Sequence, residues 1–428
     1  MAILKRRSMC NNPPVCREWL YKYPYKHALY IKVNDNIVLI VCLYVDDLIF
    51  TGNNPKTFEE FKRKMCCEFE MTDLGFISYY LGIEVKQTEE GIFIVQENYA
   101  KELLQKFNMS NCNPVNTPEE CNIKLSRYDD GAKVDPTLFR SLVGSLRYLT
   151  CIRPDILFGV GLVSRCMEAP TTTHLKAAKK ILHYIKGTLD FELHYYASNV
   201  FRLRGFSDSD WGGDIDDRKS TSGFVFYMGN TAFTWSSKKQ PAVTLSACEV
   251  EYVAVSFCVT QVVWLRNLLN KLHFTQREHI EVNVNNKSVI VLAKNPLFHE
   301  CSKHIDTKYH FVHECIANKV LKINFVKSQD QIRDILTKSL ELNTFKALRS
   351  LLGASPQLNR KSFPPPKSTS ISYTKLLALL KSLLPGSINE VKLSVSGKMK
   401  TSSDGNLEKG QKQLDLKVYN KAITTENL

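Results

Sequence analysis

The sequence contains no long uninterrupted apolar run, no apolar N-terminal segment and no paired cysteine motif. Across its 428 residues, no apolar run approaches the ~18–20 residues that a membrane-spanning helix needs. The first residues, Met1 to Arg7, lack the apolar core of a secretory signal. The 13 cysteines are scattered and form no C-x-x-C pair of a zinc or redox site. We therefore expect an intracellular protein of the cytoplasm or nucleus, with free thiols, that is neither secreted nor held in a membrane.

The composition is that of a globular protein with a basic surplus. Hydrophobic residues make up 44% and charged residues 23%, which excludes disorder of the whole chain. The length predicts two or three domains. The net charge is +14, and the last 73 residues contribute half of it, with 12 Lys and Arg against 5 Asp and Glu. A basic chain is compatible with nucleic-acid binding, but charge alone is a weak argument.

Hairpins and one helix are expected in the first hundred residues. Ala28 to Val33 and Ile37 to Val45 are β-rich runs separated by a polar turn, and a second turn falls at Asp46-Asp47. Phe58 to Phe69 has apolar residues at helical spacing, which predicts an amphipathic helix. Leu81 to Val95 reads as another hairpin.

Beyond residue 110 the composition and the hydrophobic pattern divide the chain into a loop, a helical stretch, an alternating unit and a tail. Residues 110–135 are rich in Asn, Pro, Cys and Asp and predict a connecting loop, and Thr137 to Lys186 has a helical pattern broken by prolines. Val200 to Leu340 alternates strands and helices, which indicates an α/β or α+β unit. After Gly353 the chain is rich in Ser, Lys and Pro, and only Tyr373 to Leu384 has the pattern of a short amphipathic helix.

Asp46 and Asp47 are adjacent carboxylates at the tip of an apolar hairpin. Buried strands hold such a turn rigidly, and its acids can ligate Mg²⁺ ions that bridge phosphate oxygens, as nucleotide polymerases require. The alternative is a solvated β-turn, since Asp is a favoured turn residue. The full string Leu43-Tyr44-Val45-Asp46-Asp47-Leu48 is more specific than a bare pair of acids.

Residues 44–53, Tyr-Val-Asp-Asp-Leu-Ile-Phe-Thr-Gly-Asn, resemble the palm signature of reverse transcriptases from copia-type (Ty1/copia) LTR retrotransposons. The resemblance continues in the family's order to about residue 353. Its further motifs include Leu81-Gly82-Ile83-Glu84-Val85, Arg153-Pro154-Asp155-Ile156, Ser207-Asp208-Ser209-Asp210-Trp211, Lys219-Ser220-Thr221-Ser222-Gly223 and Asp334-Ile335-Leu336-Thr337-Lys338. The resemblance implies the C-terminal part of a Pol polyprotein, in which reverse transcriptase is joined to ribonuclease H.

This resemblance predicts four regions and an α+β / α/β fold class. We expect a truncated reverse-transcriptase palm, a helical thumb-like connection, an RNase H-like α/β domain and an unmatched, partly disordered basic tail. Their boundaries are 1–130, 131–195, 196–353 and 354–428. The resemblance implies Mg²⁺ or Mn²⁺ as cofactor and an RNA–DNA hybrid or other nucleic acid as partner, and it leaves room for other element-encoded chains.

The polymerase site is expected to be incomplete. A two-metal site needs a further carboxylate, which the family places well upstream of the Tyr-Val-Asp-Asp turn. Before Asp46 the chain has only two acids, Glu18 and Asp35, and Asp35 lies at the wrong end of the hairpin. We therefore expect no polymerisation from this chain alone.

The nuclease half should hold three or four acids around two metal ions ~3.5–4 Å apart. Asp208 follows an apolar strand residue and is the first candidate, although it could also be a turn acid. In Ser246-Ala247-Cys248-Glu249, the S-x-x-E pattern of a capping box gives Glu249 a role at the helix start. Glu251 lies on the same face as the apolar stripe, where a metal site would explain a buried acid. The resemblance also selects Glu251, and it adds Asp334.

Asn285 is the departure from the family pattern. The family reads Asp-Asn-Lys-Ser where this chain has Asn285-Asn286-Lys287-Ser288, so an amide replaces the expected metal-bridging acid. The amide keeps one acceptor oxygen but loses the negative charge. That loss should weaken metal binding and slow hydrolysis by orders of magnitude, unless a neighbouring acid substitutes. Arg333, where the family has a small residue before Asp334, is a second departure.

Three functions remain open at this point. The chain is a weakly active nuclease for RNA–DNA hybrids, a noncatalytic nucleic-acid-binding protein, or a degenerate product of the element. The catalytic and metal-binding residues expected from the sequence are Asp208, Glu251, Asp334, Asp46 and Asp47, with Asn285 in an acid position.

Overall fold

The computed structural model describes most of the chain up to Pro356. The described residues are 2–6, 20–22, 28–34, 37–44, 47–88, 90–121, 124–196, 202–272, 276, 278–295, 306–327, 332–356, 391–392 and 419–420. The helix expected at Tyr373 to Leu384 lies outside them, as do Glu18, Asp35 and Asp46. The two short strands beyond residue 356, β17 (Val391–Lys392) and β18 (Tyr419–Asn420), pair with each other.

The first sheet has six strands in the order β2-β3-β4-β5-β1-β6. Its strands are β1 (Ala2–Arg6), β2 (Tyr21–Lys22), β3 (Leu29–Asn34), β4 (Ile37–Tyr44), β5 (Asp47–Gly52) and β6 (Met71–Phe76). The β3–β4 and β4–β5 hairpins and the helix α2 (Pro55–Glu68) confirm the expected elements, within a few residues at each end.

The β4 strand is apolar along its whole length because both of its faces are buried. Leu39 and Val41 pack with Phe61 and Met65 of α2 on one face. Ile40 and Cys42 face the other way and belong to the main core of the protein. A strand that is covered on both sides reads as a continuous apolar run rather than as an alternating one.

The second sheet joins segments that are far apart in the sequence. Its order is β16-β10-β9-β8-β7, and all the pairs are antiparallel. The strands are β7 (Tyr79–Tyr80), β8 (Ile83–Gln87), β9 (Gly91–Val95), β10 (Phe191–Tyr196) and β16 (Ala354–Pro356). The β8–β9 hairpin was expected, but its pairing with β10 and β16 was not, because no local pattern encodes a partner a hundred residues away.

Helices follow the second sheet in the region where the sequence predicts them. They are α3 (Glu97–Lys106), α4 (Pro136–Leu149), η1 (Pro154–Ile156), α5 (Leu157–Ser164) and α6 (Thr172–Lys186). No helix or strand interrupts the described residues between α3 and α4, as the loop prediction requires. The helical pattern breaks at Pro154 and Pro170, and each break separates two helices.

A buried polar network links η1, α6 and the end of the chain's folded part. Arg153 donates to both carboxylate oxygens of Asp155, over 2.9 and 2.8 Å. Tyr184 of α6 donates to Asp155 as well, over 2.6 Å, and Arg349 of α10 (Leu342–Leu351) donates to the Tyr184 oxygen. Arg153 also donates to the Thr188 carbonyl. Because the network spans three elements, it fixes their relative positions.

The third sheet has the order β13-β12-β11-β14-β15. Antiparallel pairs join β11 (Leu203–Ser209), β12 (Thr221–Met228) and β13 (Thr231–Lys239), whereas β14 (Ile280–Val284) and β15 (Leu321–Phe325) continue the sheet in parallel. The helices of this part are α7 (Ala247–Lys271), α8 (Lys287–Lys294), α9 (Asp306–Ala317) and the short η5 (Ile332–Leu336). Strands and helices therefore alternate, as the sequence predicts.

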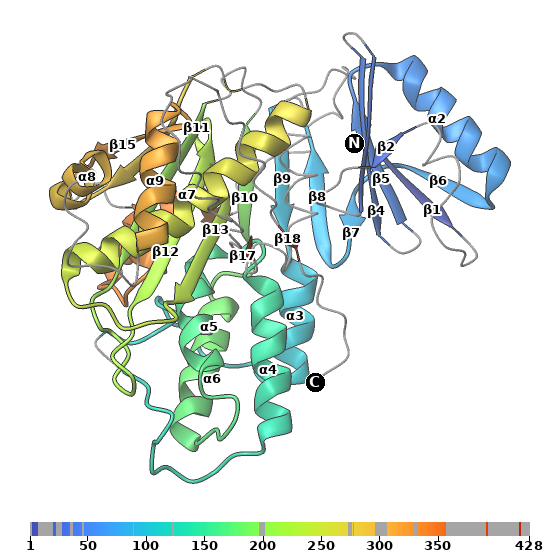
Figure 1. Ribbon diagram of the computed structural model, residues 1–428. Coiled ribbons are helices and arrows are strands. Elements are labelled where there is room, and N and C mark those ends of the chain that lie inside the picture. The colour runs from blue at the N-terminus through green and yellow to red at the C-terminus, as the bar shows by residue number, and fades with distance from the viewer. Residues whose placement is uncertain are drawn as a thin grey trace, which may run out of the picture.

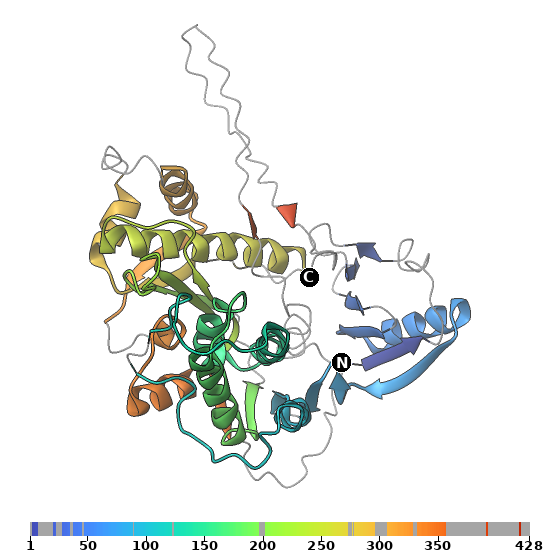
Figure 2. The same ribbon diagram turned by 90° about the horizontal axis from the view of Figure 1, so that it is seen from below.

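The two outer sheets lie on opposite sides of the molecule. Figure 1 shows the first sheet with α2 on one side and the third sheet with α7 and α9 on the other, with β7 to β10 between them. The same separation is visible from below in Figure 2. The fold is therefore α+β / α/β, with mixed sheets and helices throughout the described part.

Helix α7 corrects one expectation. It has 25 residues and is long and apolar enough to cross a membrane, although the sequence was expected to contain no such segment. However, 78% of its apolar window is buried inside the structure, and it packs against β11. A helix that is apolar all round meets the same criteria when it forms the core of a folded domain.

Candidate nuclease site

Asp208 lies near the end of the central strand β11, opposite Gly223 of β12. Its side chain is buried, and its Oδ2 atom accepts a hydrogen bond of 2.6 Å from the hydroxyl of Thr337, which directly follows η5. A Cβ atom at position 223 would lie 2.8 Å from the Thr337 methyl group. Glycine at 223 therefore lets η5 approach the strand pair closely enough for Thr337 to reach Asp208.

The start of α7 separates the roles of its two glutamates. Ser246 caps the helix by accepting from the Glu249 backbone N–H, and the Glu249 carboxylate accepts from the Leu245 N–H over 2.7 Å. Glu249 is thus used in capping the helix, as the S-x-x-E pattern predicts. Glu251 comes half a turn later and is 8% exposed, so it lies on a buried face as expected.

Glu251 and Asn285 line one cavity at the carboxyl ends of β11 and β14. The cavity has a volume of about 290 Å³, and its other lining residues are Ser209, Trp211, Ala247, Val250, Asn286 and Lys287. Since β11 and β14 are parallel, with Phe206 opposite Asn283, the same register brings Asn285 level with Asp208. Asp208 and Asn285 therefore lie at the same end of two adjacent strands, and Glu251 of α7 shares a cavity with Asn285.

The Asn285 amide has an unmet hydrogen-bonding capacity. Its Oδ1 atom is buried and has no hydrogen-bond partner among the described residues. A buried acceptor without a donor is costly, so the atom is explained best by a group that the structure does not contain, such as a water molecule or a cation. The neighbouring Asn286 has a purely structural contact, because its Oδ1 accepts from the Ser288 N–H and caps α8.

Asp334 lies on η5 and makes an ion pair with Lys338 one turn later. The distance between Asp334 Oδ2 and Lys338 Nζ is 2.7 Å. Asp334 does not line the cavity of Glu251 and Asn285. The side chain of Arg333 lies outside the described part of the chain, so its expected effect on Asp334 stays a prediction.

The described residues do not assemble a full carboxylate cluster. Within them, no three side chains of His, Cys, Asp or Glu come close enough to hold a metal ion. Glu251 and Asn285 offer two oxygens to one cavity, whereas Asp208 and Asp334 contact Thr337 and Lys338. Oxygen ligands suit Mg²⁺ and Mn²⁺, so the donor type fits these ions, but the negative charge at the cavity is lower than a two-metal site requires.

Three residues at this site were not singled out from the sequence. Trp211 is 70% exposed at the cavity, and Lys287 also lines it. Asp210 accepts a hydrogen bond from the Thr221 N–H, and burial together with the neighbouring Asp208 charge raises the pKa of Asp210 to about 6. The sequence carried no signal for the exposure of Trp211, because exposure depends on how the β11–β12 loop folds.

Strand β5, which begins at Asp47, lies in the first sheet, away from this site (Figure 1). Asp46 is outside the described residues. Asp47 begins β5 opposite Tyr44, and β1 runs along the other edge of β5 with Lys5 opposite Asp47. The roles of Asp46 and Asp47 therefore remain predictions.

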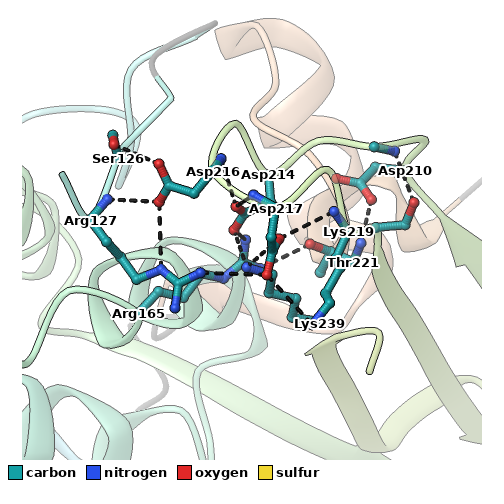
Figure 3. Close-up of polar contacts among 12 residues, drawn as sticks. Ser126, Arg127, Arg165, Asp210, Asp214, Asp216, Asp217, Lys219, Thr221 and Lys239 are labelled. Carbon is teal, nitrogen blue, oxygen red and sulfur yellow. Dashed lines mark hydrogen bonds and ion pairs between the residues drawn. The ribbon is translucent and has the colours of Figure 1, made fainter. Parts of the chain in front are cut away.

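The acids of the β11–β12 loop form ion pairs. Asp214 accepts from Arg165 at the end of α5, over 3.1 Å, and from Lys239 of β13, over 2.6 Å. Asp216 accepts from the Ser126 hydroxyl and the Arg127 N–H. Figure 3 shows these contacts, with Arg127 and Arg165 reaching the loop from other segments. The loop acids therefore hold the third sheet against the helical region and the segment that precedes it.

Replacing Asp214 with Asn is expected to lower the free energy of unfolding by about 1–2 kcal/mol at pH 7, because the charge-assisted bonds are lost. Burial alone would raise the pKa of Asp214, but hydrogen bonds from Lys239 and from the Asp217 and Asp216 N–H groups lower it to about 2. A depressed pKa stabilises the fold above the ordinary value of 3.8 and loses this effect as the pH falls toward 2. Urea titrations of both proteins should therefore converge below pH 4, and a difference that is independent of pH would contradict the assignment.

Comparison with known proteins identifies the family. The family model described as reverse transcriptase (RNA-dependent DNA polymerase) matches residues 17–121. The retrovirus-related Pol polyprotein from transposon RE1 of Arabidopsis thaliana is 35% identical over 328 residues, which are 77% of this chain and 22% of that polyprotein. An uncharacterized mitochondrial protein of the same plant is 37% identical over 227 residues, which are 53% of this chain and 94% of that protein. The chain belongs to the copia-type Pol polyprotein family. The resemblance seen in the sequence is thereby confirmed.

The match to copia-type Pol polyproteins covers only part of their length. The polyprotein from transposon TNT 1-94 of Nicotiana tabacum is 34% identical over 359 residues, which are 79% of this chain and 27% of that polyprotein. The chain thus spans about a quarter of the length of the Pol polyproteins that it matches.

Solved structures similar to this Pol chain include a reverse transcriptase and a ribonuclease H. The foamy viral protease-reverse transcriptase in complex with double-stranded DNA has a TM-score of 0.41 at 13% identity, covering 67% of this chain and 46% of that one. LC11-RNase H1 in complex with an RNA/DNA hybrid has a TM-score of 0.25 at 13% identity, covering 32% and 94%. Scores of this size support no conclusion about activity.

Proposed function

We propose that the third sheet and its helices form an RNase H-like unit that binds RNA–DNA hybrids but cleaves their RNA strand slowly or not at all. The observation that carries this proposal is the position of Asn285. It lies in the same cavity as the buried Glu251, level with Asp208, where the family pattern has an acid.

The physical reason for slow cleavage is charge. Hydrolysis by two divalent metal ions requires carboxylates that offset the charge of both ions. If Mg²⁺ or Mn²⁺ binds in this cavity, Glu251 and Asn285 would hold it, and it would supply an activated water for hydrolysis. Asn285 contributes only a neutral carbonyl oxygen, so the site holds one negative charge fewer than the family pattern provides.

The surroundings of the cavity support nucleic-acid binding without any metal. Trp211 exposes its ring at the cavity, where it can stack on a base or pack against a sugar. Lys287 lines the same cavity and can contact a phosphate group. Trp211 follows the end of β11 and Lys287 begins α8 just after β14, so the two side chains come from the ends of neighbouring strands.

The polymerase part is proposed to be inactive in this chain of 428 residues. The only acids before Asp46 are Glu18 and Asp35, and both lie outside the described residues. Other element-encoded chains could supply the missing carboxylate. We expect no extension of a primed RNA template by this chain alone, and primer extension with Mg²⁺ and all four deoxynucleotides tests this.

The proposed function is tested with the full chain and a labelled RNA–DNA hybrid. We expect binding that weakens steeply with salt, because phosphate contacts release counterions, together with cleavage close to background in Mg²⁺ and in Mn²⁺. Trp211→Ala should weaken binding about 5- to 150-fold, which corresponds to the ~1–3 kcal/mol of a base-stacking contact. Cleavage by the parent at the rate of an acid-containing variant would contradict the proposal, and so would an absence of hybrid binding.

A further inference from the structure

A second and larger cavity lies in the helical region, between the segment that follows α3 and the helices α5 and α6. Its volume is about 550 Å³, which is within the ~300–1,000 Å³ typical of small-molecule sites. Leu162, Val163 and Ile181 are among the apolar residues of its wall. Neither the nuclease site nor the polymerase hairpin contributes to this cavity.

The inner end of this cavity holds a carboxyl group. The Oε2 atom of Glu119 is buried and has no hydrogen-bond partner among the described residues. It lies against Gly159 of α5, where a Cβ atom would come within 2.6 Å of it, so glycine makes the room for the carboxyl group. Burial, assisted by the charge of Asp155 and opposed by Lys180, raises the pKa of Glu119 to about 8. The group is therefore mostly a neutral acid at pH 7 and can both donate and accept.

The outer end carries positive charge. Lys176 and Lys179 of α6 line the cavity and are exposed. Neither makes an ion pair with any described residue, whereas the nearby Lys180 is held by Glu120 at 3.3 Å. The spacing of three residues puts both free ammonium groups on the same face of the helix.

We propose that this cavity binds a nucleoside monophosphate, with the base at Glu119 and the phosphate at Lys176 and Lys179. The ligand must have a polar inner end, since a hydrocarbon chain placed there would leave the Glu119 carboxyl group buried without a partner. Its middle must pack against the apolar side chains of the wall, as a base or sugar ring can, and its outer end must be anionic to match the lysines. This site goes beyond the proposed nuclease function and does not depend on it.

The test is calorimetric titration of the full chain at pH 7 with AMP, GMP, CMP and UMP, and with the matching nucleosides. At least one monophosphate is expected to bind saturably and about five- to tenfold more tightly than its nucleoside. Glu119→Leu should weaken that binding about tenfold, whereas Glu119→Gln, which still forms hydrogen bonds, should stay within about threefold. The double variant Lys176→Ala/Lys179→Ala should bind the monophosphate no better than the nucleoside.

Two further variants test whether the nucleotide binds in this cavity and not elsewhere on the protein. Gly159→Ala places a methyl group 2.6 Å from Glu119 Oε2, so the carboxyl group must shift and the binding should weaken about tenfold. Lys86→Ala removes an exposed lysine from β8, which does not line the cavity, and should leave the affinity unchanged. The proposal is overturned if no monophosphate binds at millimolar concentration, if Glu119→Leu and Gly159→Ala bind like the parent, or if dodecanoate binds in place of the nucleotides.

Discussion

The Asn285→Asp variant is expected to cleave the RNA strand of an RNA–DNA hybrid at least about 100-fold faster than the parent chain in Mg²⁺ or Mn²⁺. The substitution changes one amide to a carboxylate of nearly the same shape, so the fold should not be disturbed. It adds a full negative charge beside Glu251, in the cavity where the phosphate and the metal ions would meet. A gain of two orders of magnitude corresponds to about 2.7 kcal/mol at the transition state, a modest value for a restored metal ligand.

The controls for this variant separate catalysis from a general effect of charge. Asn286→Asp adds the same charge one residue later, and since Asp caps helices as well as Asn does, α8 should remain intact. We expect it to give less than a tenth of the gain. Adding Glu251→Gln to Asn285→Asp should remove the gain altogether. Equal rates for the parent and the Asn285→Asp variant would show that the amide does not limit cleavage.

The Asp155→Ala variant is expected to lower the free energy of unfolding by about 3–5 kcal/mol. The side chains of Arg153 and Asp155 are 7% and 0% exposed, so removing the acid leaves a guanidinium group buried without its counter-charge. Tyr184 loses the acceptor of its hydroxyl group in the same step, and Tyr184 also holds Arg349. The substitution should therefore also weaken the contact between α6 and α10, which the Tyr184–Arg349 hydrogen bond makes. Urea unfolding followed by tryptophan fluorescence measures this effect.

An exposed ion pair on α3 serves as the control for the buried pair of Arg153 and Asp155. Glu97 and Lys101 form an ion pair of 2.6 Å on α3, but their side chains are 29% and 54% exposed, so Glu97→Ala should cost less than about 1 kcal/mol. The double variant Arg153→Met/Asp155→Leu should recover part of the Asp155→Ala loss, because no charge is then left buried. If Asp155→Ala lowered the free energy of unfolding no more than Glu97→Ala does, the buried Arg153–Asp155 pair would contribute no more than a surface pair.

The pH dependence of the network follows from the same contacts. Burial alone would raise the pKa of Asp155, but Arg153 and the Tyr184 hydroxyl group outweigh burial and lower it. A lowered pKa means that the contribution is complete above the ordinary value of 3.8 and declines as the pH falls below it. The difference between the parent and Asp155→Ala should therefore shrink in acid.

Features with a local cause could be predicted from the sequence. The capping pattern separates Glu249 from Glu251 because both the cap and the apolar stripe are set by helix geometry within two turns. The hairpins of β3, β4 and β5 follow from runs of β-forming residues between polar turns. The ion pair of Asp334 and Lys338 was not predicted, although its spacing of four residues could have revealed it.

Contacts between segments that are distant in the sequence could not be predicted from it. Thr337 bonds to Asp208 across 129 residues, and the absence of a side chain at Gly223 leaves the room for this contact. The segment 110–135 looks like a plain connection in the sequence, and nothing in its local pattern shows that Glu119 meets Gly159 of α5. Similarly, the pairing of β16 and β10 with the β8–β9 hairpin depends on the whole fold rather than on any strand's own composition.

The central claim is that the amide at position 285 lowers the metal affinity of the site formed with Glu251. The most direct measurement is Mn²⁺ binding followed by electron paramagnetic resonance of the free ion, for the parent, Asn285→Asp and Asn285→Asp/Glu251→Gln. We predict that Asn285→Asp binds one additional Mn²⁺ at least about tenfold more tightly than the parent, and that Glu251→Gln abolishes this gain. Identical Mn²⁺ titrations for all three chains would contradict the account.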